Sequence, residues 1–173
     1  MIDFYQEENF FNENESKLID DCLFNESFNF PLFFHNEQCD GDGIPFFSHS
    51  LINRNGDKVS NFTEIFLSLV ERFILQKSNL KPKKILRSCI NITLPMVGKT
   101  AVHVDHDEEY YQVICYLNDA TGNTVIFDDN GSIVKSVEPK KGRIIMFNKL
   151  KHKANLPSIP NKIRAVMVTT FKI

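Results

Sequence analysis

Residues 123–137 read NTVIFDDNGSIVKSV, and this stretch decides the fold class. A β-branched and aromatic run, Asn123–Phe127, is followed by Asp129-Asn130-Gly131 and then by a second run, Ser132–Val137. Asn-Gly between two such runs is a strong local signal for a β-hairpin, because both residue types tolerate the positive φ of tight hairpin turns. The stretch therefore predicts two antiparallel strands joined at Asn-Gly.

Further strand signals lie on both sides of this hairpin. They are Ile85–Leu94 and Tyr111–Leu117 upstream, and Arg143–Phe147 and Ala165–Phe171 downstream, with a second turn at Pro139–Gly142. Roughly seven short strands with closely spaced turns are typical of a β-sandwich or a jelly roll.

Two amphipathic helices are predicted before the strands. Residues 14–24 and 61–76 both carry apolar side chains at helical spacing, and Asn61 followed by Glu64 resembles a capping box. Because the helices precede the strands, we expect an α+β, mainly β fold: a cupin-like jelly roll with N-terminal flanking helices. One domain should span 1–173, with the helical flank and outer strands in 1–84 and the jelly-roll core in 85–173.

Composition excludes several classes of protein. The net charge of -2 and pI of about 6.2 give no basic field for nucleic acid. Four scattered cysteines, with no CxxC pair, argue against a zinc ribbon or a disulfide scaffold, and Cys89 and Cys115 fall in apolar runs typical of a core. The acidic start of the chain lacks a signal-peptide pattern, and no apolar run could cross a bilayer, so a cytoplasmic protein without membrane contact is expected.

His103-Val104-Asp105 is the strongest candidate for a metal site. In an extended chain, residues two apart point to the same side, so one imidazole and one carboxylate can approach a single ion. His152 follows the strand that ends at Phe147 and could complete two histidines and one carboxylate, the facial triad of non-heme iron(II) oxygenases.

Each of these candidate ligands also has an interpretation that involves no metal. A His-x-Asp tripeptide occurs by chance on surfaces, and His152 lies in a basic loop, Lys151–Lys153. Of the neighbouring residues, His106 points to the opposite side of the extended chain from His103 and Asp105, and Asp107 is expected beyond the turn. His35 and His49 have no carboxylate at matching spacing.

Arg164 begins an otherwise apolar strand, on the face of Val166 and Val168. A buried arginine needs an anion, and its planar fork suits a carboxylate such as the distal group of 2-oxoglutarate. Lys162 lies on the same face of the strand as Arg164 and remains a competing anchor for the 2-oxoglutarate carboxylate. The alternative interpretation of Arg164 is an ion pair with a surface acid. Tyr116 lies in the strand after the His-x-Asp motif; its hydroxyl could assist the same carboxylate or bond a backbone carbonyl.

The ordered motifs of the second half resemble one enzyme family. They are, in chain order, Leu86–Asn91, His103–Asp105, Tyr116–Asn118, Gly122–Phe127, Val137–Arg143, Phe147, His152 and Arg164–Phe171. This order resembles the prolyl 4-hydroxylase-like branch of 2-oxoglutarate- and iron(II)-dependent oxygenases, and within it small phage-type and marine microbial members. The resemblance covers about residues 46–173 and is strongest over 85–173.

The resemblance implies a double-stranded β-helix, the jelly roll of these enzymes. It assigns the iron to His103, Asp105 and His152, and the 2-oxoglutarate pocket to Arg164, Tyr116 and Asn91. The implied reaction hydroxylates a substrate and releases succinate and carbon dioxide, with ascorbate as a possible further cofactor. The substrate class stays open between a peptidyl side chain and a small molecule, and so does the oligomeric state.

The chain departs from the family pattern at two places. Gly122-Asn123 stands where a double glycine is usual, and the span from His152 to Arg164 is longer than in the oxygen sensors, which keeps Lys162 open as the anchor. A cupin-like metal-dependent isomerase or hydrolase and a non-catalytic jelly-roll binding module remain rival readings. The acids Asp107, Glu108 and Glu109 would favour a cationic substrate if they bordered the mouth, and would otherwise be a solvated loop.

Overall fold

The structure is a computed structural model that describes residues 4–39, 41–78, 80–98 and 100–173. Helices and strands follow one another in the order β1 (Phe4–Glu7), α1 (Glu13–Phe24), β2 (Phe33–His35), β3 (Phe46–Ile52), α2 (Thr63–Lys77), β4 (Lys84–Thr93), β5 (Tyr111–Tyr116), β6 (Thr124–Phe127), β7 (Ile133–Val137), β8 (Ile144–Asn148), β9 (His152–Ala154) and β10 (Arg164–Lys172).

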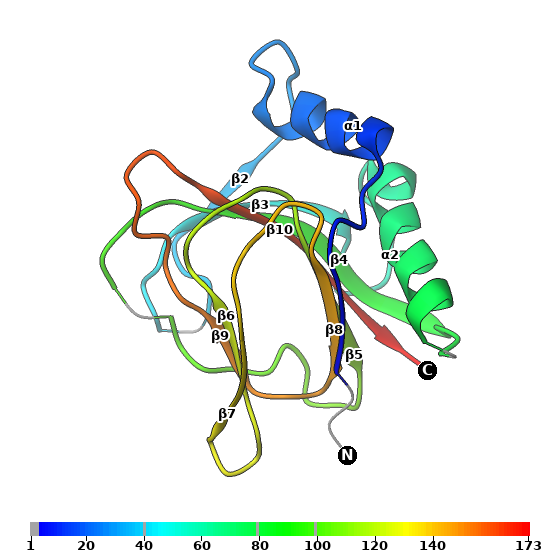
Figure 1. The fold of residues 1–173 in the computed structure, drawn as a ribbon, viewed down its shortest axis with the longest axis vertical. Helices are drawn as coiled ribbons and strands as arrows, with labels where there is room; N and C mark the ends of the chain where they lie inside the picture. The colour runs from blue at the N-terminus through cyan, green and yellow to red at the C-terminus, as the bar shows by residue number, and fades with distance from the viewer. Residues whose placement is uncertain (1–3, 40, 79, 99) are drawn as a thin grey trace.

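The strands form two antiparallel sheets. A seven-stranded sheet has the order β1-β8-β5-β10-β4-β3-β2, and a three-stranded sheet has the order β7-β6-β9. Figure 1 shows the small sheet lying across from β5 and β8, so that the two sheets enclose an interior. This arrangement confirms the expected mainly β jelly roll.

The predicted hairpin is present as β6 and β7, with Thr124 opposite Val137. The Asp128 N–H donates to the Ser132 carbonyl at 2.9 Å, and Gly131 has φ 81°. Asn130 does not adopt a positive φ. The connection is therefore a longer loop than the two-residue turn that Asn-Gly alone suggests.

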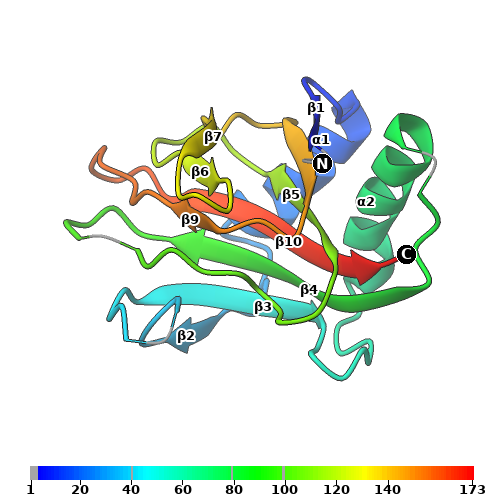
Figure 2. The ribbon, with the colours of Figure 1, turned by 90° about the horizontal axis from the view of Figure 1, so that it is seen from below.

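The two helices cover the seven-stranded sheet unequally. Side chains of α2 share one buried cluster with outward residues of β4, β5, β8 and β10, whereas α1 adds the buried Ile19 and Cys22 and the partly buried Leu23. Figure 2 shows α2 lying along the end of the sheet, so it is the clearer flank. In the described part of the chain, neither helix has the length and apolar character needed to cross a membrane.

The capping box predicted at Asn61 and Glu64 is wrong. Helix α2 starts at Thr63 after Phe62, which makes no side-chain cap, and Glu64 pairs with Lys58 instead. A complete capping box starts α1. There the Glu15 N–H donates to the Asn12 side chain, and the Asn12 N–H donates to the Glu15 carboxylate, both at 2.9 Å.

Strands from the first 84 residues form both edges of the large sheet. β1 pairs with β8, while β3 pairs with β4 and carries β2 outside it. The strands between them alternate their side chains, so every second residue of β4, β5 and β10 faces the interior between the sheets. That inward face holds the candidate site.

Candidate active site

Backbone pairing places His103 and His152 directly opposite each other. An isolated antiparallel bridge joins them, with N–H to carbonyl distances of 3.0 and 2.9 Å in the two directions. Opposed residues of such a pair project to the same side, and the two imidazole centroids are 4.5 Å apart. The bridge extends the three-stranded sheet beyond β9 and fixes the imidazole spacing through the backbone.

Asp105 completes a cluster of three possible metal ligands. One carboxylate oxygen lies 3.7 Å from His103 Nε2 and the other lies 4.0 Å from His152 Nε2, with all ligand atoms within 4.8 Å of one another. The Asp105 N–H donates to the Tyr110 hydroxyl at 2.9 Å, which holds the turn after the motif. Burial raises the pKa of Tyr110, so this hydroxyl stays neutral.

Both imidazoles present the nitrogen that a metal needs. His152 Nδ1–H donates to the Leu150 carbonyl at 3.1 Å, and His103 Nδ1–H faces the Ala101 carbonyl at 3.2 Å and Cys39 Sγ at 3.1 Å. A carbonyl only accepts, so the proton sits on Nδ1 and each Nε2 carries the lone pair that a metal needs. Burial lowers the pKa of His152, which favours its neutral, metal-binding form.

Gln112 is a member of the site that the sequence did not reveal. It is buried on β5, and its Nε2 lies 3.2 Å from His152 Nε2, while its Oε1 is buried and has no hydrogen-bond partner among the residues that the structure describes. A polar residue at the inward parity of Ile114 and Tyr116 was the available signal, but the sequence alone did not show which face pointed inward.

The donor set fits a divalent transition metal. Two neutral imidazoles and one carboxylate on one side of an ion leave the opposite positions open, as non-heme iron(II) sites require. The other histidines considered from the sequence lie outside this cluster. His106 forms a hydrogen bond with Thr170 at 2.8 Å, and His35 and His49 form hydrogen bonds with serines elsewhere.

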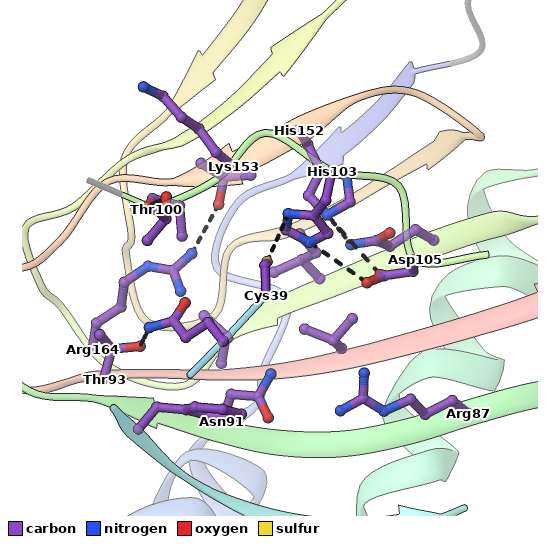
Figure 3. Close-up of a pocket in the computed structure, with 18 residues that line it drawn as sticks. Cys39, Arg87, Asn91, Thr93, Thr100, His103, Asp105, His152, Lys153 and Arg164 are labelled. Atoms are coloured by element: carbon purple, nitrogen blue, oxygen red, sulfur yellow. Dashed lines mark hydrogen bonds and ion pairs between the residues drawn. The ribbon is translucent and has the colours of Figure 1, made fainter. Parts of the chain in front are cut away.

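A cavity runs from this cluster along the inward face of the large sheet (Figure 3). Its described lining includes all three clustered residues and both Asn91 and Arg164. Arg164 and Thr93 are paired neighbours on β10 and β4, so the guanidinium lies at one end of the cavity. The structure therefore brings the candidate metal ligands and the candidate carboxylate anchor into one space.

Arg164 is a buried cation without an anion. It is 4% exposed, and it donates to the Gly122 carbonyl at 3.0 Å and to Thr124 Oγ1 at 2.9 Å. Within the described residues, no carboxylate reaches ion-pair distance of it, which removes the surface ion pair as an explanation. Burial lowers the pKa of Arg164. A buried guanidinium with unused donors is suited to an incoming carboxylate.

The backbone at Gly122 requires glycine, whereas the next position, where the resembled family usually has a second glycine, does not. Its φ is 93°, and a Cβ there would lie 2.4 Å from the Asn155 carbonyl oxygen. The side chain of the next residue, Asn123, instead reaches outward to Ser136 at 3.0 Å. The first position therefore needs glycine to hold the carbonyl that Arg164 contacts, while the second does not.

Tyr116 and Thr124 extend the polar end of the cavity. The fully buried Tyr116 hydroxyl donates to Thr124 Oγ1 at 2.8 Å, the oxygen that also accepts from Arg164. With both lone pairs of Thr124 engaged, its own proton remains for an acceptor in the cavity. Asn91 Oδ1 is buried in the same cavity and finds no hydrogen-bond partner in the described part of the chain.

Lys162 lies outside this arrangement. It is exposed and borders a surface depression with Asp20 and Lys141, not the cavity that holds Arg164. The acids 107–109 are also exposed and do not line the cavity; Glu108 pairs with Lys172.

Comparisons with known proteins bear on the fold. No protein-family model matches the sequence, and no curated protein matches it. Among solved structures, a 2OG-Fe(II) oxygenase family oxidoreductase from Burkholderia pseudomallei matches with a TM-score of 0.77 at 18% identity, over 99% of this chain and 84% of that one.

Two prolyl hydroxylases also match. The Pseudomonas putida prolyl-4-hydroxylase has a TM-score of 0.64 at 16% identity, over 97% of this chain and 91% of that one. A prolyl hydroxylase from Trichoplax adhaerens, in complex with a hypoxia inducible factor peptide fragment, has a TM-score of 0.67 at 16% identity, covering 97% and 82%. At these identities the matches establish the fold, which is the jelly roll of 2-oxoglutarate oxygenases such as the prolyl 4-hydroxylases.

Proposed function

We propose that this protein is an iron(II)- and 2-oxoglutarate-dependent oxygenase that hydroxylates its substrate. The observation that carries the proposal is the shared cavity. It holds a two-histidine, one-carboxylate cluster together with Arg164, a buried cation for which the described residues supply no anion. A metal site alone would not require that cation.

His103, Asp105 and His152 would hold the iron. When bound, iron(II) and 2-oxoglutarate supply oxygen activation coupled to decarboxylation, which yields succinate, carbon dioxide and a hydroxylated substrate. The chain supplies orientation: the Ala101 and Leu150 carbonyls fix the two imidazole tautomers, and Tyr110 fixes the Asp105 turn.

Arg164 and Thr124 would hold the co-substrate's distal carboxylate, and Tyr116 would orient the Thr124 hydroxyl. Arg164 presents its remaining N–H donors, and Thr124 has a hydroxyl proton to donate. Asn91 lies on the inward face of β4 and lines the cavity, and it would border the bound co-substrate. Burial of this end excludes water and strengthens each charged contact.

The rival functions explain less of the cavity. A cupin-like isomerase or hydrolase would use the three metal ligands, but its reaction would not require the buried Arg164, which is 4% exposed. A binding module would leave the matched imidazole tautomers without a purpose. The four scattered cysteines, with no CxxC pair, fit the reducing, cytoplasmic setting that we propose for the enzyme.

Uncoupled turnover tests the proposal. The protein is loaded anaerobically with iron(II), 2-oxoglutarate and ascorbate, then exposed to oxygen, and succinate is measured. We expect slow succinate formation in the parent and none above background in Asp105→Ala. Equal succinate from both proteins would overturn the proposal, and so would its absence from a parent that demonstrably binds iron(II).

A further inference from the structure

Arg87 is the cation that the proposed function leaves unused. It is half-buried on the inward face of β4 and lines the same cavity as the candidate metal ligands. Its guanidinium forms no hydrogen bond or ion pair with any residue that the structure describes. Surface arginines find solvent easily, but one facing an active-site cavity is available to a ligand.

The sheet register places Arg87 away from the co-substrate end. Thr93 pairs with Arg164, whereas Arg87, six residues earlier on β4, pairs with Thr170. Six residues of strand span about 20 Å. Figure 3 shows Arg87 and Arg164 rising from opposite ends of the cavity. Arg87 is therefore too far along the strand to share a carboxylate with Arg164.

The same register places Arg87 near the metal cluster. Thr170 pairs with Arg87 on one side and with Gln112 on the other, so the three residues form one row across the sheet. Two strand spacings separate the ends of this row, or about 10 Å. Because Gln112 contacts His152 Nε2, Arg87 borders the space beside the metal cluster.

Charge in the loaded cavity supports the same role. Asp105 is the only acid among the cavity's described lining residues, and the cations are Arg87, Lys153 and Arg164. A divalent metal and doubly charged 2-oxoglutarate, together with Asp105 and Arg164, would balance to neutrality. Figure 3 shows Lys153 extending away from the cavity, so Arg87 remains uncompensated inside it.

A second arginine lies on the same side. Arg54 is exposed in the loop after β3, and its Nη1 approaches the Asp105 carbonyl at 3.5 Å, with no carboxylate at ion-pair distance in the described chain. The acidic residues 107–109 do not neutralise the positive charge of Arg54 and Arg87 inside the cavity, because none of the three lines it. The side of the cavity away from Arg164 is therefore cationic.

We infer that Arg87 recognises an oxyanion, a carboxylate or a phosphate, on the substrate that is hydroxylated. The inference rests on the proposed function and names the class of its substrate. The guanidinium would hold the anionic group beside the metal cluster, so that a carbon several bonds away faces the open metal positions. Arg54 would add to the attraction at the mouth.

The test uses small probes with the Mn(II)- and 2-oxoglutarate-loaded protein, which does not turn over. Acetate and methylphosphonate serve as the carboxylate and phosphate probes, and acetamide is the neutral match of acetate. Broadening of each methyl proton signal by Mn(II) reports binding near the metal. In the parent we expect acetate, methylphosphonate or both to be broadened more than acetamide, and the preferred probe identifies the group.

Arg87→Gln should reduce that broadening at least about fivefold, while Arg87→Lys should retain part of it, because an ammonium keeps the charge but not the fork. Lys81→Gln, which removes an exposed cation outside the cavity, is the matched control and should change nothing. Calorimetry should show unchanged 2-oxoglutarate affinity in Arg87→Gln.

Three results would overturn the inference. The first is equal broadening of the probe signals in Arg87→Gln and in the parent. The second is a parent that broadens neither anion more than acetamide. The third is a loss of 2-oxoglutarate affinity in Arg87→Gln, which would place Arg87 in the co-substrate pocket. A parent that binds 2-oxoglutarate but shows no anion preference refutes this inference alone. A parent that binds no 2-oxoglutarate refutes the proposed function as well.

Discussion

The two faces of the seven-stranded sheet are built from the same strands but serve different ends. The outward face packs apolar residues such as Ile90 and Met167 into one cluster with α2. Its buried polar pair, Ser88 and Thr169, is satisfied internally by a 2.8 Å hydrogen bond. The inward face carries Arg164, Asn91 and Gln112. Among the described residues, the charge of Arg164 has no counterion, and one buried oxygen each of Asn91 and Gln112 has no hydrogen-bond partner.

The difference separates stability from ligand binding. A face whose polar groups satisfy one another contributes to folding without a ligand. A face whose buried polar groups lack partners costs free energy until a ligand supplies them. We therefore expect outward substitutions to change the free energy of unfolding and inward substitutions to change ligand binding.

The largest effect should come from the metal cluster. Asp105→Ala or His152→Ala should weaken divalent metal binding by more than about 100-fold, because outer-shell partners alone are worth about 10–100-fold. Titration calorimetry with Mn(II) measures this. His35→Ala removes an exposed histidine that bonds to Ser48 and should bind metal as the parent does. Parent-like affinity in both cluster variants would place the metal elsewhere.

Phe73→Ala tests the outward face. Phe73 is fully buried in α2, with its ring edge-to-face with Phe10 at 5.6 Å, so truncation should lower the free energy of unfolding by about 3–5 kcal/mol. Urea unfolding measures the loss. Leu75→Ala, in the same helix but 74% exposed, should cost under about 0.5 kcal/mol. A folded Phe73→Ala protein that has lost metal affinity would break the separation of the two faces.

Arg164→Ala tests the inward face at the co-substrate end. Leaving the distal carboxylate unpaired should weaken 2-oxoglutarate binding by roughly 2–5 kcal/mol, with metal binding intact. Arg164→Lys should recover only part, because one ammonium cannot reproduce the fork. Calorimetry with Mn(II) in place of iron gives both numbers without turnover. If Lys162→Ala reduces affinity and Arg164→Ala does not, the anchor is Lys162.

Tyr116→Phe should have the smallest effect. It removes the hydroxyl that donates to Thr124, so 2-oxoglutarate binding should weaken by about 0.5–1.5 kcal/mol, the scale of one neutral hydrogen bond. Thr124→Val should cost more, because Thr124 also accepts from Arg164. The same calorimetry ranks the two variants, and the reverse order would show that Tyr116 contacts the co-substrate directly.

Sequence patterns predicted the central strands because each is a dense apolar or β-branched run. They located none of β1, β2, β3 and β9; of these, β2 and β9 have three residues each and form through pairing with β3 and β6 rather than through their own composition. The parity of His103 and Asp105 correctly indicated that both side chains point to one side. Gln112 and Thr124 escaped notice because alternation shows that a strand has two faces without showing which one is inward.

The bridge between His103 and His152 has a consequence for how the chain opens. Its two hydrogen bonds close a loop that contains β5, β6, β7 and β8, so an ion bound to both imidazoles would act as a cross-link between distant parts of the chain. The amide protons of His103 and His152 are the donors of that bridge. Metal loading should therefore slow their exchange with deuterium together, and chelation should release both at once.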